Sequence, residues 1–404
     1  MKNLIIGYGI TGKSVEKYLI KKEIDYLIHD DIPENLSEVK ETLIFKDEDF
    51  NNIYEVIISP GISPDNPLVE KFLSKNIPIK TDIDLFASYY KGDIIGVTGT
   101  NGKTTFVKEL SKFLNLNNIQ NHTAGNVGVS PLEISENIYD YVILELSSYQ
   151  LHYTSKLNLD LAIILNIYSD HIDWHKTFTN YSSSKIKILS FLDTLKGERK
   201  IIGTNNDVIK SNLPITSPLH KLTSSKIHPE LLIALGESVK IIGGQDLYNL
   251  FCEYIKVNEI NYPHRLEEFK KLDKQNVTFI NDSKATNYHA VSQATKLFSQ
   301  DDVEGVLILH GITKETSENS LDIDPSFKKI IIPHSMNVKL GAHSAEVIYI
   351  DSILDLKEKL ESLISCNQVI LFSCGGASFN DFKNYEERGN YFKDLITSMD
   401  LKND

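Results

Sequence analysis

The ten residues "GVTGTNGKTT" at positions 96–105 decide the fold of the chain around them. They follow the apolar run "DIIGV" and precede the amphipathic "FVKELSKFL", so a buried strand, a glycine turn and a helix are predicted in that order. The strict phosphate-loop pattern, Gly-x-x-x-x-Gly-Lys-Ser/Thr, is not met, because its first glycine would fall at Val97. Gly99 and Gly102 still allow a curled backbone, Lys103 can reach phosphate oxygens, and the Thr104 hydroxyl suits Mg²⁺. A glycine turn with a surface lysine is the structural alternative.

A second glycine loop occurs near the N-terminus, in "NLIIGYGITGKS" at residues 3–14. An apolar run, Gly-x-Gly-x-x-Gly and a helix start, with Asp30 at the end of the next apolar run, match the dinucleotide-binding pattern. Taken alone, this pattern favours NAD or FAD, and a tight turn without a ligand stays open. The stretch "SPGISPDNP", at residues 59–67, also follows an apolar run, and any nucleotide diphosphate could bind at such a strand end.

Length and charge exclude several classes of protein. With 404 residues the chain is too long for one hydrophobic core, so two or three domains are expected. The formal net charge of −13 argues against nucleic acid and anionic membranes as partners. No run of about eighteen apolar residues occurs, so no membrane span is expected, and the N-terminus does not resemble an export signal. Cys252, Cys366 and Cys374 fit a reduced cytoplasm and suggest neither a disulfide framework nor a zinc site.

Apolar runs that alternate with helix-compatible stretches predict an α/β fold with parallel sheets. The strand candidates are "NLIIG", "YLIHD", "TLIF" and "EVIIS", then "YVILELSS" and "LDLAIILNI", and finally "VTFIND", "GVLILHG", "KKIIIPH", "VIYID" and "QVILFSCGG". A charged link containing glycine precedes the strand before the phosphate loop, and Pro263 follows the amphipathic "DLYNLFCEYIKV". We therefore predict three domains, at residues 1–91, 92–261 and 262–404.

The stretch "TGTNGKTT" resembles the ATP-binding loop of the Mur ligase family, a superfamily that also includes the folylpolyglutamate synthetases. Further stretches similar to this family follow in order: "GNVG" at 125–128, "ELSSYQL" at 145–151, "NIYSDHIDWH" at 166–175, "YSSSKIKIL" at 181–189 and "YPHRLE" at 262–267. Two more, "FINDSKATN" at 279–287 and "SCGGASFNDFKNYEERG" at 373–389, resemble the D-glutamate-adding branch of the family. The resemblance covers nearly the whole chain.

The resemblance implies a Rossmann-like N-terminal domain, a P-loop ATPase-like central domain with a mostly parallel sheet, and a Rossmann-like C-terminal domain. It implies an ATP-dependent ligase that adds D-glutamate to UDP-N-acetylmuramoyl-L-alanine through an acyl phosphate. The first glycine loop would then hold the uridine diphosphate part of the substrate, and the second would hold ATP. This reaction belongs to peptidoglycan synthesis, hence to cell-wall biogenesis, cell shape and cell division, and a monomeric enzyme in the bacterial cytoplasm is expected.

The family motifs also imply roles for single residues. The expected catalytic residues are Lys103, Glu145, His171, Lys185, Arg265 and Lys284. The expected ATP-binding residues are Gly99, Thr100, Asn101, Gly102, Lys103, Thr104, Thr105, Asn249, Arg265 and Asp282. Two Mg²⁺ ions are expected, with ligands from Thr104, Glu145, His171 and Lys185, the last as a carbamylated lysine. Without the family, Glu145 could be a core acid, His171 a zinc ligand or a loop residue, and Lys185 a solvated charge.

The two other substrates have expected residues of their own. Those for the UDP-bearing substrate are Gly9, Ile10, Thr11, Asp30, Asp31, Ser59, Pro60, Gly61, Asn126, Ser147 and Gln150. Those for D-glutamate are Lys284, Thr286, Lys314, Ser378 and Phe382, cations and hydroxyls that suit a dicarboxylate. The chain departs from the family at "QDLYN", where of the usual His-Asn-x-x-Asn only Asn249 is retained, at Ile32, where some relatives have arginine, and at His310, where glycine is usual.

Other functions compete with this interpretation. A nicotinamide-dependent oxidoreductase explains the first glycine loop and leaves the chain after Lys91 unexplained. A non-catalytic nucleotide-binding regulator is less consistent with the retention of Lys103, Glu145, His171 and Lys185. Within the family, an L-alanine-adding ligase is the main alternative. Folylpolyglutamate synthetases lack the N-terminal domain, and tripeptide-adding ligases carry a different acceptor signature.

Overall fold

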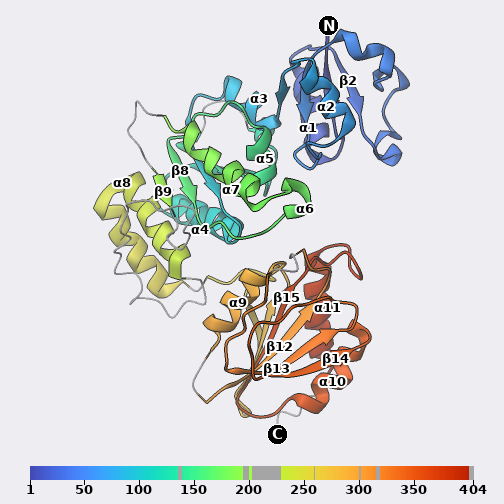
Figure 1. Ribbon diagram of the computed structural model, residues 1–404. Coiled ribbons are helices and arrows are strands. Elements are labelled where there is room, and N and C mark those ends of the chain that lie inside the picture. The colour runs from blue at the N-terminus through green and yellow to red at the C-terminus, as the bar shows by residue number, and fades with distance from the viewer. Residues whose placement is uncertain are drawn as a thin grey trace. The chain divides into compact units, whose positions relative to one another are not determined.

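The structure, a computed structural model, contains three β-sheets with helices packed on them (Figure 1). It describes residues 1–134, 139–193, 200–202, 229–258, 260–299, 302–314 and 319–399. The first two sheets belong to one compact unit, which includes helix residues as far as Tyr254. The second unit contains Tyr168–Asp173 and the chain from Ile255 onward. The limits of the three expected domains stay predictions.

The N-terminal sheet has four parallel strands in the order β2 (Tyr26–His29), β1 (Lys2–Ile6), β3 (Ile53–Ile58) and β4 (Ile79–Lys80). Its helices are α1 (Ile10–Lys21), α2 (Pro67–Ser74) and α3 (Asp82–Tyr89). Leu4 and Ile6 of β1 lie in one buried cluster, and Ile5 lies in another with Val15 and Leu19 of α1. Alternate residues of β1 therefore fill cores on opposite faces, which explains why Leu4, Ile5 and Ile6 are all apolar.

The apolar run "TLIF" at residues 42–45 does not form the strand that the sequence predicted. Residues Glu41–Leu43 form a 3-10 helix, and Ile44 makes a single isolated bridge to Ile28. Two further 3-10 segments, Pro33–Leu36 and Asp47–Asn52, lie on either side of it. Phe45 is nevertheless buried in the N-terminal core, so the run has a packing role without a ladder of its own.

The central sheet has five parallel strands in the order β6 (Asn121–Gly125), β7 (Tyr141–Glu145), β5 (Asp93–Thr98), β8 (Leu161–Ile164) and β9 (Lys200–Ile202). Its helices are α4 (Lys103–Leu116), α5 (Ser148–Tyr153), α6 (Ile172–His175), α7 (Phe178–Ile186) and α8 (Pro229–Val257). Two non-helical residues, Gly243 and Gly244, interrupt α8. Its second half packs on α4, because the ring of Phe113 contacts those of Phe251 and Tyr254.

The C-terminal sheet has six strands in the order β10 (Glu267–Leu272), β11 (Val277–Asp282), β15 (Gln368–Gly375), β12 (Glu304–His310), β13 (Phe327–Pro333) and β14 (Glu346–Ile350). All pairs are parallel except β10 with β11. Helices α10 (Leu356–Leu363) and α11 (Tyr385–Ser398) share one core with the sheet, and α9 (Tyr288–Leu297) shares another. The carboxyl ends of β11, β15 and β12 are therefore neighbours, which is where open sheets bind ligands.

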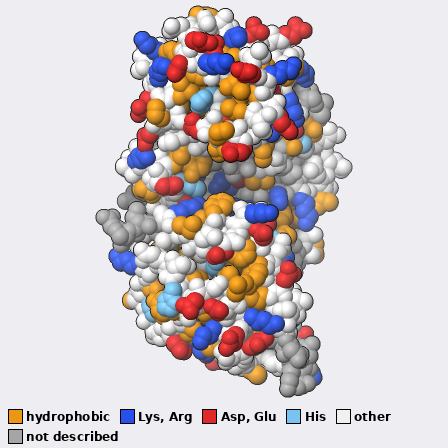
Figure 2. Space-filling model, turned by 90° about the vertical axis from the view of Figure 1, so that its right-hand side faces the viewer, with side chains coloured by type: hydrophobic (Ala, Val, Ile, Leu, Met, Phe, Trp, Pro, Cys, Tyr) orange, Lys and Arg blue, Asp and Glu red, His pale blue; other side chains and the backbone are white. Residues whose placement is uncertain are grey.

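Charged side chains of both signs lie on one face of the molecule (Figure 2). On the face drawn in Figure 2, acidic and basic side chains are interspersed over the surface. Among the described helices, none combines the length and the apolar character that a membrane span requires.

Candidate functional site

The phosphate loop of the central sheet follows β5 and ends at the first residue of α4. Gly102 has φ +84°, a left-handed conformation that glycine adopts without strain and other residues rarely adopt. The first N–H groups of α4 have no partner within the helix and can bind an anion. Lys103 Nζ donates to the carbonyls of Gly99 at 2.7 Å and Thr100 at 3.0 Å, so its ammonium group lies over the loop. The loop therefore offers both backbone donors and a cation to a phosphate.

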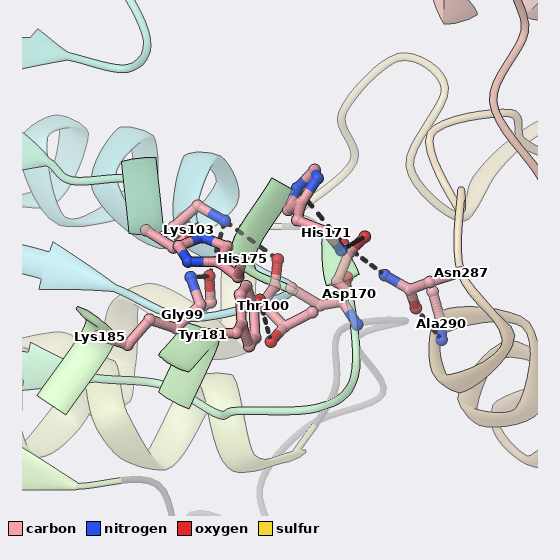
Figure 3. A network of polar contacts seen from close by, with 12 residues as sticks. Gly99, Thr100, Lys103, Asp170, His171, His175, Tyr181, Lys185, Asn287 and Ala290 are labelled. Carbon is pink, nitrogen blue, oxygen red and sulfur yellow. Dashed lines mark hydrogen bonds and ion pairs between the residues drawn. The ribbon is translucent and has the colours of Figure 1, made fainter. Parts of the chain in front are cut away.

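Lys185 reaches the same loop from α7. Its side chain is 2% exposed, and its Nζ donates to the Gly99 carbonyl at 2.9 Å (Figure 3). The same ammonium lies 4.8 Å from the centroid of the Tyr181 ring. Two lysines from separate elements thus meet at one carbonyl oxygen, and the solvated alternative for Lys185 is excluded.

Glu145 is the last residue of β7 and pairs in register with Val97 of β5, so it lies beside the phosphate loop. Its side chain is 1% exposed. Oε1 accepts a hydrogen bond from Asn126 Nδ2 at 2.8 Å, whereas Oε2 is buried and has no hydrogen-bond partner among the described residues. An unpaired buried carboxylate oxygen is costly unless a cation satisfies it. This oxygen therefore fits a metal-binding role.

The donor set around Glu145 fits magnesium better than zinc. Among the described residues, no group of three or more His, Cys, Asp or Glu side chains could hold a metal ion. Magnesium commonly takes one or two protein oxygens and completes its shell with water and phosphate oxygens. Thr104, in the first turn of α4 and 8% exposed, supplies a hydroxyl of the required kind.

Two residues that the sequence analysis did not single out hold the loop in place. Asn166 Oδ1 accepts from Asn101 N at 2.9 Å, and Asn166 Nδ2 donates to Asn101 O at 3.1 Å. The hydroxyl of Tyr181 hydrogen-bonds Thr100 Oγ1 at 2.8 Å. Asn166 follows β8, the neighbour of β5, so its position after an adjacent strand was a usable signal.

His171 belongs to the second unit and is held by its neighbour Asp170. It has φ 54°, and its N–H donates to Asp170 Oδ1 at 2.9 Å. Its Nε2 lies 3.6 Å from Asp170 Oδ2, which also accepts from Asn287 Nδ2 at 3.4 Å. The Asp170 carboxylate therefore orients both the backbone and the ring of His171 (Figure 3).

The first glycine loop is packed as tightly as its pattern predicts. A Cβ on Gly12 would lie 2.2 Å from the carbonyl oxygen of Gly7, and Ser59 Oγ donates to that same oxygen at 2.7 Å. Asp30 accepts from the N–H of Tyr8 at 2.5 Å through Oδ2 and from Ile32 at 2.8 Å through Oδ1. Both carboxylate oxygens of Asp30 thus hold the backbone around the loop.

Other residues expected for the UDP-bearing substrate have local structural contacts. Ser147 and Gln150 form the capping box of α5, with Ser147 N donating to Gln150 Oε1 at 3.0 Å. Trp174 Nε1 donates to Gly61 O at 3.3 Å, and the Tyr153 hydroxyl donates to Ile62 O at 2.9 Å. These two bonds connect the loop after β3 to the helices of the central sheet.

The second unit brings several of the remaining expected residues together. Asp282 accepts from Leu266 N at 3.1 Å and from Ser373 Oγ at 2.7 Å. Burial raises the pKa of the Asp282 carboxyl to about 7, although these bonds and Arg265 act in the opposite direction. Lys284 Nζ lies 4.0 Å from the centroid of the Tyr385 ring.

The loops after β12 and β15 are joined by a pair of backbone hydrogen bonds. Ile312 N donates to Ala377 O at 2.9 Å, and Ala377 N donates to Ile312 O at 2.8 Å. Lys314 and Ser378 follow these residues by one or two positions. Phe382 N donates to Ser378 O at 3.0 Å, which forms a turn. The structure thus places the loops of three expected D-glutamate residues next to one another.

His310, one of the departures from the family pattern, lies at this same place. Its Nε2 is 3.0 Å from Asp381 Oδ2, and its ring meets that of Phe382 edge-on at 5.6 Å. Burial, and secondarily the charge of Arg388, lowers the pKa of His310 to about 4, so the ring is neutral near pH 7. His310 therefore serves as a neutral hydrogen-bond partner of Asp381.

The other expected residues are less closely engaged. Asn249 lies on α8, is exposed, and accepts from Gln245 Nε2 at 3.0 Å. The Asp31 carboxylate accepts from Asn66 Nδ2 at 2.9 Å, and Ile10 is 88% exposed. The half-buried members of this set are Thr11, Pro60, Thr105, Thr286 and Lys314.

Comparison with known proteins agrees with this geometry. Residues 1–81 match the "Mur ligase MurD-like, N-terminal domain", and residues 97–217 match the "Mur ligase middle domain". The UDP-N-acetylmuramoylalanine–D-glutamate ligase of Thermosipho africanus is 30% identical over 99% of both chains, and that of Thermotoga maritima is 28% identical over 98% of both. Among solved structures, the UDP-N-acetylmuramate-alanine ligase MurC of Thermotoga maritima has a TM-score of 0.52 at 14% identity and covers 99% of this chain and 100% of its own.

The three α/β sheets and the phosphate loop define an α/β protein of the class that binds nucleotide phosphates at a strand–loop–helix turn. The family models and the relatives that match from end to end narrow this class to one family. The chain belongs to the Mur ligase family.

Proposed function

We propose that the protein is an ATP-dependent ligase that joins D-glutamate to UDP-N-acetylmuramoyl-L-alanine in peptidoglycan precursor synthesis in the bacterial cytoplasm. The observation that carries the proposal is the meeting of Lys103 and Lys185 at the Gly99 carbonyl, with Glu145 on the adjacent strand. The choice of D-glutamate is supported by relatives of that name that match along nearly the full chain. We assign the UDP-bearing substrate to residues 1–91, ATP to 92–261 and D-glutamate to 262–404.

The first step activates the substrate carboxylate. One carboxylate oxygen attacks the γ-phosphorus of ATP, the bond to the β-phosphate oxygen breaks, and an acyl phosphate and ADP result. Lys103 and the first N–H groups of α4 offset the charge of the β and γ phosphates, and Thr100, Asn101 and Thr105 line the same loop. Arg265, Asp282 and Asn249 complete the proposed nucleotide contacts.

The second step forms the amide. The neutral amine of D-glutamate attacks the acyl carbon, and the tetrahedral intermediate expels phosphate while the nitrogen loses a proton. Catalysis here is mostly positioning and charge neutralisation. Lys284 and Lys314 offset the two carboxylates, Thr286 and Ser378 offer hydroxyl groups, and Phe382 packs against the aliphatic part.

Magnesium would supply charge neutralisation beside the transferred phosphoryl group. Thr104 and Glu145 would hold one ion, and His171 and Lys185 would hold a second. We propose that Lys185 acts as a carbamate: its neutral amine attacks CO₂, a nitrogen–carbon bond forms, and one proton leaves. The product is an anionic oxygen ligand, and the nearly complete burial of this side chain beside the phosphate loop supports such a role.

The decisive assay measures phosphate release with ATP and UDP-N-acetylmuramoyl-L-alanine while the amino acid is varied. We expect release with D-glutamate and little with L-glutamate or L-alanine. Release with L-alanine alone, using the muramate substrate that lacks alanine, would assign the chain to the L-alanine-adding branch. Tight NADH binding without nucleotide-dependent phosphate release would favour an oxidoreductase and overturn the proposal.

A further inference from the structure

A buried cation of the second unit has no role in the two proposed reaction steps, formation of the acyl phosphate and formation of the amide. Arg388 lies in the first turn of α11 and is 0% exposed. A guanidinium group is costly to bury unless its N–H groups find acceptors of good geometry. The fold therefore retains an expensive group, and its hydrogen bonds indicate why.

The acceptors of Arg388 come from three loops. Its Nε donates to Ser283 Oγ at 3.0 Å, and its Nη2 donates to Ser283 O at 2.7 Å. Its Nη1 donates to His310 O at 3.0 Å and to Gly376 O at 3.0 Å. Ser283 follows β11, His310 ends β12 and Gly376 follows β15, the strand between them. One planar group thus spans the carboxyl ends of three neighbouring strands.

The positive charge of Arg388 is stabilised by the dipoles of these carbonyl and hydroxyl groups. Within the described part of the chain, no carboxylate lies at ion-pair distance from its guanidinium group. The rigid fork of an arginine suits several fixed oxygens at once, and a lysine ammonium on a flexible stem cannot reproduce this pattern. The side chain is therefore matched to the spacing of the three loops.

The loops themselves are packed at the limit of contact. A Cβ on Gly311 would lie 2.2 Å from Ala377 O and 2.7 Å from Arg388 Nη1. A Cβ on Gly376 would lie 2.8 Å from the carbonyl carbon of Gly311. A small change in the position of the guanidinium group must therefore move the loops relative to one another.

We infer that Arg388 is a positioning residue that fixes the spacing of the acceptor-binding groups, an inference that rests on the proposed function. Lys284 directly follows Ser283, Ser378 lies two residues after Gly376, and Lys314 lies four residues after His310. D-glutamate carries two carboxylates joined by a flexible chain of three carbon atoms, and a rigid set of partners selects one separation between them. Its binding depends on the distances between these cations and hydroxyls, which Arg388 sets without touching the substrate.

The test compares Arg388→Lys with Ser283→Ala, varying each of the three substrates in steady-state kinetics. Arg388→Lys keeps the charge and loses the fork, so we expect the KM for D-glutamate to rise by about tenfold or more. The KM values for ATP and for UDP-N-acetylmuramoyl-L-alanine should stay within about twofold. Ser283→Ala removes one acceptor of Arg388 and should raise the KM for D-glutamate by a smaller factor. If Arg388→Lys does not fold, the KM for D-glutamate of Ser283→Ala still tests the inference.

Phe392→Leu is the matched control, on the same helix. Phe392 is 0% exposed and stacks on Phe372 at 4.5 Å, so this change should lower Tm without altering the KM for D-glutamate. Arg388→Lys that lowers Tm and leaves the KM for D-glutamate unchanged, or that shifts all three KM values together, would overturn the inference. A wild-type enzyme that uses another amino acid would overturn the proposed function instead, and the same variants assayed with that amino acid still decide the role of Arg388.

Discussion

The amine of Lys185 is the group on which turnover should depend most steeply. Lys185→Ala removes the donor to Gly99 and, in the proposal, the carbamate ligand. We expect kcat to fall by about 100-fold or more, because the loss falls on charge stabilisation in the transition state. Small carboxylic acids such as formate or acetate should restore part of kcat, since they can supply the missing anionic oxygen.

Lys187, two residues further along, provides the control for Lys185. Its Nζ donates to His152 O at 2.9 Å, and burial lowers its pKa. Lys187→Ala removes a half-buried cation two residues away but no contact with the phosphate loop, so kcat should change little. Full activity of Lys185→Ala without added acid would remove Lys185 from the proposed catalytic set.

The raised pKa of the Asp282 carboxyl predicts that the stability of the folded protein depends on pH. Its pKa is about 7 in the folded protein and near 4 when unfolded, so between these values the folded state binds more protons. The stability that this carboxyl contributes is complete below about pH 4 and is lost as the pH rises through about 7. Asp282→Asn cannot ionise, so its free energy of unfolding relative to wild type should increase over this range, by at most about 4 kcal/mol.

Urea denaturation of both proteins at several pH values measures this difference directly. His310 acts in the opposite direction, because its lowered pKa favours stability at higher pH, and it is present in both proteins, so its contribution cancels. A difference that is constant from acid to neutral pH would contradict the raised pKa of Asp282.

Sequence reasoning found residues whose chemistry is visible in a motif and missed residues whose partners are distant in the chain. Lys103 and Gly102 could be predicted because a glycine turn before a lysine at a helix start implies phosphate chemistry. Tyr181 and Arg388 contact groups that lie 81 and up to 105 positions away, respectively. Such pairings depend on which strand ends become neighbours, and local pattern does not specify that.

The close packing of Gly12 against strand β1 predicts that a larger residue there destabilises the position of helix α1. Gly12→Ala would place a methyl group 2.2 Å from the Gly7 carbonyl, so strand β1 and helix α1 must separate. We expect a loss of roughly 1–3 kcal/mol in stability, typical of overpacking, and a higher KM for the UDP-bearing substrate. Gly9→Ala is the matched control for stability, because a Cβ there meets nothing within 4 Å. Equal Tm values for the two variants would contradict the packing argument.

At the scale of elements, apolar strands could be predicted, including the edge strands β2 and β14, whereas polar edge strands could not. The runs that became β5, β7 and β12 are apolar because both of their faces are covered. β6, with the sequence "NHTAG", lies at an edge and is mostly polar, and β10, "EEFKKL", is a partly exposed edge strand paired antiparallel. The strand prediction for residues 42–45 was wrong for the opposite reason. These residues are apolar because Phe45 packs in the core, and they form no paired strand.

Taken as a whole, the molecule divides its proposed substrates between two compact units. All residues assigned to the UDP-bearing substrate, from Gly9 to Gln150, belong to the first unit. All those assigned to D-glutamate, from Lys284 to Phe382, belong to the second. A multidomain chain need not unfold in one step, and a ligand stabilises only the unit that binds it.

We therefore expect two unfolding transitions, and Trp174 identifies the first. It is the only tryptophan in the sequence and belongs to the first unit, so its fluorescence reports that unit alone, whereas far-UV circular dichroism reports both. UDP-N-acetylmuramoyl-L-alanine at about 100 times its Kd should stabilise the unit that binds it by about 2.7 kcal/mol, so the fluorescence transition should move to higher temperature. The other transition should stay in place, and Gly12→Ala should weaken the shift. A single transition that moves as one in both signals would show that the units unfold together and would contradict this division.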